Sequence, residues 1–153
     1  DAMAGRVRFL DESHSVIFTD KGIQFFSTRV ETSPELVSQI PIEENIRSIT
    51  YAQDKVGIVT DNMEGGDPYR LRIYDREGST VFEKSFNYQY TGFDIDGDLI
   101  LLYNDSSCKV YNMTGTEKYN GTFDFTVSKV SAGRFPGTLL VMGPQKMTEI
   151  KLQ

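Results

Sequence analysis

The sequence predicts an all-β, β-propeller-like fold of about four blade units, each with three to four antiparallel strands and the last one incomplete. A hairpin pattern, in which an apolar run is followed by a second strand, recurs four times in 153 residues. The copies are spaced by about 40 residues, the repeat length of propeller blades. Eight Tyr and ten Phe accompany many Val, Ile and Thr, and these residue types favour strands.

The apolar run of each unit predicts a central strand. Consecutive apolar residues are expected where a strand is buried between two packed sheets. Asp96-Gly97, just before the third run, supplies the residue types that tight hairpins need. The runs are 15–20, 56–61, 99–105 and 138–143, and the strands that follow them are 22–27, 69–78, 108–115 and 147–152.

Further strands flank these hairpins. A strand is expected before each run, at 6–10, 46–51, 90–95 and 127–132, and a more polar strand after three units, at 36–42, 80–86 and 117–123. The blades then cover 6–43, 46–87, 90–124 and 127–152, within one domain at 6–153.

Two short segments carry other expectations. Residues 1–5 are expected to be a tag remnant or a disordered start. Ser33-Pro34 is typical of a helix start, so a short helix is the alternative to a strand there.

Charge and composition exclude several function classes. The net charge of −6 disfavours nucleic-acid binding and docking on an anionic membrane, because both partners carry negative charge. No run reaches the 18 apolar residues typical of a membrane helix, so we expect no membrane insertion by this segment. Cys108 is the only cysteine, so the sequence predicts no internal disulfide.

Three segments carry a resemblance to a known family: Ile73-Tyr74-Asp75-Arg76-Glu77-Gly78, Val110-Tyr111-Asn112-Met113-Thr114-Gly115 and Ile150-Lys151-Leu152. They resemble an uncharacterised family, a domain of unknown function, of membrane-anchored, quinoprotein-like or WD40-like β-propeller proteins of Gram-positive bacteria. The resemblance implies an extracytoplasmic location at the cell surface. It implies no established activity.

A possible calcium site is the segment Asp94-Ile95-Asp96-Gly97-Asp98. Three carboxylates at alternate positions around a glycine could supply oxygen ligands to Ca²⁺, which takes six to eight of them. The alternative is a tight hairpin whose turn exposes its aspartates. We therefore expect a hairpin here and retain Asp94, Asp96 and Asp98 as the metal candidates.

A possible binding loop is the insertion at 61–68, which the other units lack. Loops on a repeated scaffold often carry binding, and Asp61, Glu64 and Asp67 could hold a metal or a basic partner. The alternative is a solvated loop without a ligand.

Catalytic residues are not predicted. His14 is the only histidine, and it lies in a turn without a second supporting motif. Cys108 is expected to pack as a small apolar side chain. No cofactor is expected, apart from the possible Ca²⁺.

These observations lead to one functional hypothesis and two alternatives. We expect a non-catalytic interaction domain, part of a larger cell-surface protein, that presents loops to a protein or glycan. An enzyme of the propeller glycosidase or quinoprotein type is the first alternative, although the absence of Trp weakens sugar or quinone stacking. The second is self-assembly, in which a homodimer completes the unfinished propeller edge.

Overall fold

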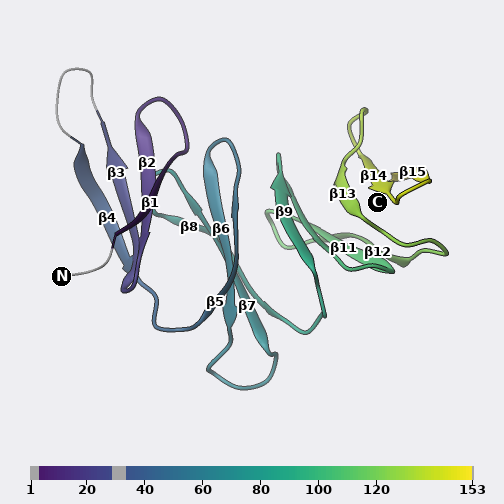
Figure 1. Ribbon diagram of the computed structural model, residues 1–153, viewed down its shortest axis with the longest axis horizontal. Helices are drawn as coiled ribbons and strands as arrows, with labels where there is room; N and C mark the ends of the chain where they lie inside the picture. Colours follow the sequence, from purple (N-terminus) through teal and green to yellow (C-terminus); the bar gives the residue numbers. More distant parts are fainter. Residues whose placement is uncertain (1–3, 29–33, 153) are drawn as a thin grey trace. The chain divides into compact units, whose positions relative to one another are not determined.

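Fifteen strands form four antiparallel sheets in chain order in the computed structural model, which describes residues 4–28 and 34–152 (Figure 1). The first sheet contains β1 (Ala4–Phe9), β2 (His14–Thr19), β3 (Gly22–Ser27) and β4 (Glu35–Pro41). The second contains β5 (Ile46–Tyr51), β6 (Lys55–Asp61), β7 (Tyr69–Asp75) and β8 (Thr80–Phe86). The third contains β9 (Gly92–Asp96), β10 (Leu99–Tyr103), β11 (Ser107–Asn112) and β12 (Glu117–Thr122), and the fourth contains β13 (Lys129–Ala132), β14 (Thr138–Met142) and β15 (Met147–Lys151).

This arrangement confirms the predicted fold class. Within each sheet, neighbours in sequence are neighbours in space, and the last sheet has three strands. The strand expected at 36–42 is also confirmed, because β4 pairs with β3 from Glu35 to Pro41. The local helix-start signal at Ser33-Pro34 is overridden by this pairing; Ser33 itself lies outside the described residues. So do residues 1–3 of the expected tag remnant, whereas Ala4 and Gly5 already belong to β1.

A repeated turn connects the third and fourth strands of the second and third sheets. The Asp75 carboxylate accepts hydrogen bonds from the amides of Glu77 (2.9 Å) and Ser79 (3.0 Å). The Asn112 side chain accepts the equivalent bonds from Thr114 (3.1 Å) and Thr116 (2.9 Å). Such side-chain bonds stabilise turns locally, which explains why the pattern was visible in the sequence. In both sheets the ladder also shifts register just before this turn.

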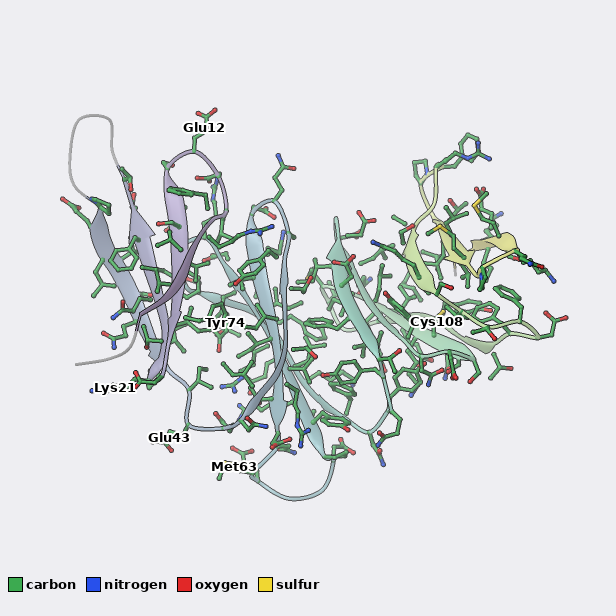
Figure 2. All side chains as sticks on the ribbon, in the orientation of Figure 1. Glu12, Lys21, Glu43, Met63, Tyr74 and Cys108 are labelled. Atoms are coloured by element: carbon green, nitrogen blue, oxygen red, sulfur yellow. The ribbon has the colours of Figure 1, made fainter. Side chains whose placement is uncertain are left out.

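The four sheets group into two compact units, residues 1–87 and 88–153. In the first unit the core lies between the first and second sheets and includes Ile23, Phe25 and Ile58, with Tyr74 lying between these sheets (Figure 2). In the second unit the core lies between the third and fourth sheets and includes Val110 and Leu139. That residues 6–153 act as one domain stays a prediction.

Among residues 4–28 and 34–152, no helix has the length and hydropathy needed to cross a bilayer.

Candidate functional site

The predicted aspartate segment forms a tight hairpin between β9 and β10. Asp96 pairs with Leu99 across the turn, and Gly97 takes a φ of 62°, a conformation that side chains with a Cβ disfavour. The hairpin expectation is therefore confirmed. In the described part of the chain, no three His, Cys, Asp or Glu side chains are close enough to hold a metal ion, so Asp94, Asp96 and Asp98 are not gathered into a ligand set.

The same turn forms one wall of a groove in the second unit. The groove has a volume of about 560 Å³, and its opposite wall is the loop between β13 and β14, which carries Arg134 and Phe135. The Asp96 carboxylate accepts a hydrogen bond from the Ala132 amide (3.0 Å), which ties the turn to the end of β13. Residues 36 positions apart in sequence thereby meet at one surface.

The groove combines three kinds of chemistry. Asp96 and Asp98 supply carboxylates, Arg134 supplies a guanidinium group, and the ring of Phe135 is 63% exposed beside them. An exposed aromatic ring beside charged groups is typical of surfaces that bind partners, because the ring contributes apolar contact area and the charges orient the ligand. The sequence alone did not point to this loop, although an aromatic side chain within Gly133-Arg134-Phe135-Pro136-Gly137 was a usable signal.

The second predicted site, the loop at 61–68, is tied to its own sheet. Asp61 accepts a hydrogen bond from Arg47 Nε (2.7 Å), and this bond lowers the pKa of its carboxyl group. Glu64 lies 3.5 Å from Arg70, and Asp67 accepts a bond from Ser85 Oγ (3.2 Å). The three acids are thus engaged with neighbouring strands.

Within this loop, Asn62 donates hydrogen bonds to the carbonyls of Gly65 (3.3 Å) and Asp67 (2.8 Å). An open groove of about 340 Å³ lies beside it, where Arg70 pairs with both Glu64 and Glu83. Because its cation and anions already neutralise one another, this groove offers less to a charged ligand than the groove beside Phe135. Met63, 74% exposed, marks the tip of the loop (Figure 2).

His14, Ser13 and Asp11 do not have the geometry of a Ser-His-Asp triad. Asp11 Oδ1 lies 2.9 Å and Ser13 Oγ 3.0 Å from the same ring nitrogen, Nδ1. A Ser-His-Asp triad needs its serine and aspartate on different ring nitrogens, because the proton taken from serine goes to the nitrogen opposite the aspartate. Asp11 also accepts a bond from Arg76 Nη1 (2.8 Å), which links the first sheet to the second.

Cys108 packs in the core of the second unit, as expected from the sequence (Figure 2). Burial raises the pKa of its thiol to about 12. At neutral pH the side chain is therefore a protonated thiol, which is a poor nucleophile.

Comparison with solved structures shows the fold. The WD40 β-propeller domain of Doa1 superimposes with a TM-score of 0.56 at 12% identity, over 99% of this chain and 52% of that one. Hsv2 of Kluyveromyces lactis gives a TM-score of 0.54 at 12% identity, over 100% of this chain and 47% of that one. BamB from Moraxella catarrhalis gives a TM-score of 0.53 at 12% identity, over 97% of this chain and 43% of that one. These neighbours are β-propellers, and this chain spans about half their length.

A family model also matches residues 1–152, and it describes a family of unknown function, DUF5711. No curated protein matches the chain.

Proposed function

Because the chain belongs to the DUF5711 family of unknown function, we propose its role from its own surface: a non-catalytic interaction domain that binds a protein segment in the groove beside Phe135. The partner segment carries a basic side chain next to an apolar one. The observation that supports this proposal is an exposed aromatic ring beside the carboxylates of Asp96 and Asp98.

The complementarity follows from simple electrostatics. A lysine or arginine of the partner would meet the carboxylates of Asp96 and Asp98 on the wall opposite Arg134, while its apolar neighbour would cover Phe135. The net charge of −6 would also speed the encounter with a basic segment at low ionic strength. Truncating an exposed aromatic anchor at the centre of an interface typically costs about 1–4 kcal/mol of binding free energy.

Nuclear magnetic resonance titration with short peptides tests the proposal. Peptides that contain Lys-Leu or Arg-Leu pairs should shift the amide signals of 96–99 and 132–138. Phe135→Ala should weaken this binding at least about tenfold, which corresponds to roughly 1.4 kcal/mol. Met63→Ala, which truncates a still more exposed side chain in the other unit, should leave the binding unchanged. The proposal fails if neutral oligosaccharides or acidic peptides produce the same shifts, or if Phe135→Ala has no effect.

We further propose that the chain is part of a larger extracytoplasmic protein of the cell surface. This location is supported by the resemblance in the segments 73–78, 110–115 and 150–152. Protease added to intact cells that produce the whole protein should cleave it, while a cytoplasmic control protein stays intact. Full protection of the protein until the cells are lysed would contradict this location.

A further inference from the structure

The strand β15 lies at the edge of the fourth sheet (Figure 1). In the first three sheets the third strand pairs with a fourth one along its outer side: β3 with β4, β7 with β8 and β11 with β12. Among residues 4–28 and 34–152, β15 pairs with β14 alone. Because an edge strand presents backbone groups to which another strand can bond, the outer side of β15 is a place for a further strand.

The register of β14 and β15 shows which backbone groups point outward. The amide of Gly143 donates to the carbonyl of Lys146 (2.7 Å) at one end of the hairpin, and the amide of Leu152 donates to the carbonyl of Gly137 (2.7 Å) at the other. The ladder keeps one register between these bonds, so the even-numbered residues of β15 point their amide and carbonyl groups at β14. The odd-numbered residues point theirs away from β14: Met147, Glu149 and Lys151.

The two faces of β15 differ in chemistry. Ile150 packs against the core of the second unit. Met147, Glu149 and Lys151 are exposed on the other face, because successive side chains of a strand alternate. A strand added at this edge would therefore turn one set of side chains toward the core and would meet a carboxylate and an ammonium group with the other set.

The third sheet supplies aromatic surface beside this edge. The first strand of the fourth sheet, β13, packs on β9 and β10, so β12 reaches past the three strands that cover the third sheet. Tyr119 in β12 and Phe123 just after it pack against the same core as Ile150, with ring centroids 6.2 Å apart. Both rings are only partly buried, so an added strand could cover them further with apolar side chains.

We propose that an extended segment of a partner protein adds to β15 as an antiparallel fourth strand. The chemistry of the segment follows from the residues that it would face: an acidic residue opposite Lys151, a basic residue opposite Glu149 and a β-branched residue opposite Ile150. Opposite charges placed directly across a ladder stabilise the pairing, and like charges destabilise it. In such strand addition the main-chain hydrogen bonds provide affinity and the alternating side chains provide specificity.

A peptide with the core Glu-Val-Lys-Val-Leu tests the proposal on the 153-residue chain. In the free chain, amide hydrogen exchange followed by nuclear magnetic resonance should be fast at Met147, Glu149 and Lys151. It should be slow at Thr148 and Ile150, whose amides donate to β14. Saturating peptide should slow the first three amides at least about tenfold, because they become hydrogen-bonded.

Two outcomes of the exchange experiment would overturn the proposal. The first is unchanged exchange at about 1 mM peptide, a concentration that reveals even weak binding. The second is slow exchange of the outward amides without peptide, because the edge would then already be occupied. Light scattering identifies a second copy as that occupant if it gives twice the 17.3 kDa of one chain.

Methylation of single peptide amides distinguishes strand addition from contact through side chains alone. In the antiparallel register the lysine amide of the peptide donates to the carbonyl of Glu149, whereas the amide of the valine after it points away from β15. N-methylation at the lysine should therefore weaken binding at least about tenfold, and N-methylation at that valine should weaken it far less. Equal losses at the two positions would contradict the proposed ladder.

Exchange of the two charges tests the specificity. The peptide Lys-Val-Glu-Val-Leu has the same composition and should bind the wild type at least about fivefold more weakly. The double variant Glu149→Lys, Lys151→Glu should reverse this preference without loss of the circular dichroism spectrum, because both side chains are exposed. Glu77→Lys, which reverses an exposed charge in the first unit, should keep the wild-type preference.

The charge-exchange experiment also separates this edge from the groove beside Phe135. Phe135→Ala should leave the binding of Glu-Val-Lys-Val-Leu unchanged, because the ring does not belong to β15 or to the third sheet. Loss of binding in Phe135→Ala would place the peptide in the groove and overturn the proposal. A charge-exchanged double variant that still prefers Glu-Val-Lys-Val-Leu would overturn it as well.

Discussion

Both units of this chain pack their sheets around an apolar core, but the first unit adds ion pairs to it. Arg76 of the second sheet pairs with Asp11 of the first (2.8 Å), and Arg72 pairs with Glu44 in the segment that connects these sheets (3.3 Å). In the second unit, the space between the third and fourth sheets is filled by apolar side chains such as Leu101, Val110, Val130 and Leu139. Among the described residues of that unit, Lys146 and Asp124 form an ion pair (3.6 Å) between exposed side chains, where such pairs contribute little.

This difference indicates which properties each unit depends on. The free energy gained by apolar burial is roughly proportional to the buried area and does not depend on direction. Because a smaller side chain leaves a cavity, the stability of the second unit should be sensitive to lost side-chain volume. A partly buried ion pair needs both partners, because a single charge left without its partner keeps its desolvation cost. The first unit should therefore respond to changes of charge and of pH.

The largest expected effect is a loss of volume in the second unit. Leu139 is fully buried, and Leu139→Ala should lower the free energy of unfolding by about 2–5 kcal/mol, because it leaves a cavity. The thiol of Cys108 lies in the same core, so its reaction with a disulfide reagent reports the opening of this unit. That reaction should speed up in the variant. Leu152→Ala, at a partly buried leucine of the same core, should lower the free energy of unfolding by less. Equal losses in the two variants would contradict a core whose stability depends on buried volume.

Two turn glycines, Gly78 in the first unit and Gly97 in the second, provide a second comparison between the units. A Cβ at Gly78 would overlap Ser38 Oγ and lie 2.9 Å from a ring carbon of Phe25, and φ there is +88°. Gly78→Ala should cost about 2–4 kcal/mol, since backbone strain and overpacking add. Gly97 has a φ of +62° but open space around it, so Gly97→Ala should cost only about 1–2 kcal/mol. Urea denaturation measures both, and equal losses would show that packing at Gly78 relaxes freely.

Much of the fold was predictable because its signals are local. The paired turns at Asp75 and Asn112 are held by hydrogen bonds to residues within four positions, so their spacing appears directly in the sequence. The helix-start signal at Ser33-Pro34 was equally local, yet β4 forms a strand because its residues pair with β3. Propensity is a weak preference that such tertiary pairing overrides.

The candidate site was predictable only in part. Asp96 and Asp98 were found because acids around a glycine stand out, but their meeting with Phe135 depends on the packing of two hairpins. Likewise, the acids at 61–68 suggested a ligand, whereas their partners Arg47, Arg70 and Ser85 come from neighbouring strands. A sequence shows which charges exist but not which of them neutralise one another.

An intermediate effect is expected at the ion pair of the first unit. The side chains of Arg72 and Glu44 are 10% and 18% exposed, and Arg72 also donates to Thr60 Oγ1 (3.2 Å). Glu44→Gln should lower the free energy of unfolding by about 1–3 kcal/mol, because Arg72 keeps a buried charge without its partner. The double variant Arg72→Met, Glu44→Leu should recover most of this loss.

The exposed pair of Arg47 with Asp61 provides the control for Glu44. Asp61→Asn removes one partner where both side chains reach solvent, and it should cost less than about 1 kcal/mol. The urea denaturation midpoints of the wild type, Glu44→Gln, the double variant and Asp61→Asn, measured at neutral pH, test this difference. A Glu44 variant no less stable than the Asp61 variant would show that the buried pair contributes nothing specific.

The smallest expected effect is a dependence on pH that belongs to the first unit. Burial acts to raise the pKa of Asp11, but bonds from the Ser13 amide, His14 and Arg76 outweigh it and hold that pKa well below the ordinary value of 3.8. Since the pKa is lower in the folded state, Asp11 stabilises the fold above about pH 4, and this contribution fades as the pH falls further. Asp11→Asn should therefore lower the melting temperature at pH 6, and the gap to the wild type should narrow towards pH 2.

The second unit provides the control for Asp11, because Asp124 is 87% exposed and pairs with Lys146 at its surface. Asp124→Asn should leave the melting temperature almost unchanged at both pH values. A gap between Asp11→Asn and the wild type that stays constant from pH 6 to pH 2 would contradict the assignment, because an uncharged contribution of Asp11 does not titrate. A narrowing gap, found for Asp11 and not for Asp124, would instead locate the acid sensitivity of the chain between its first and second sheets.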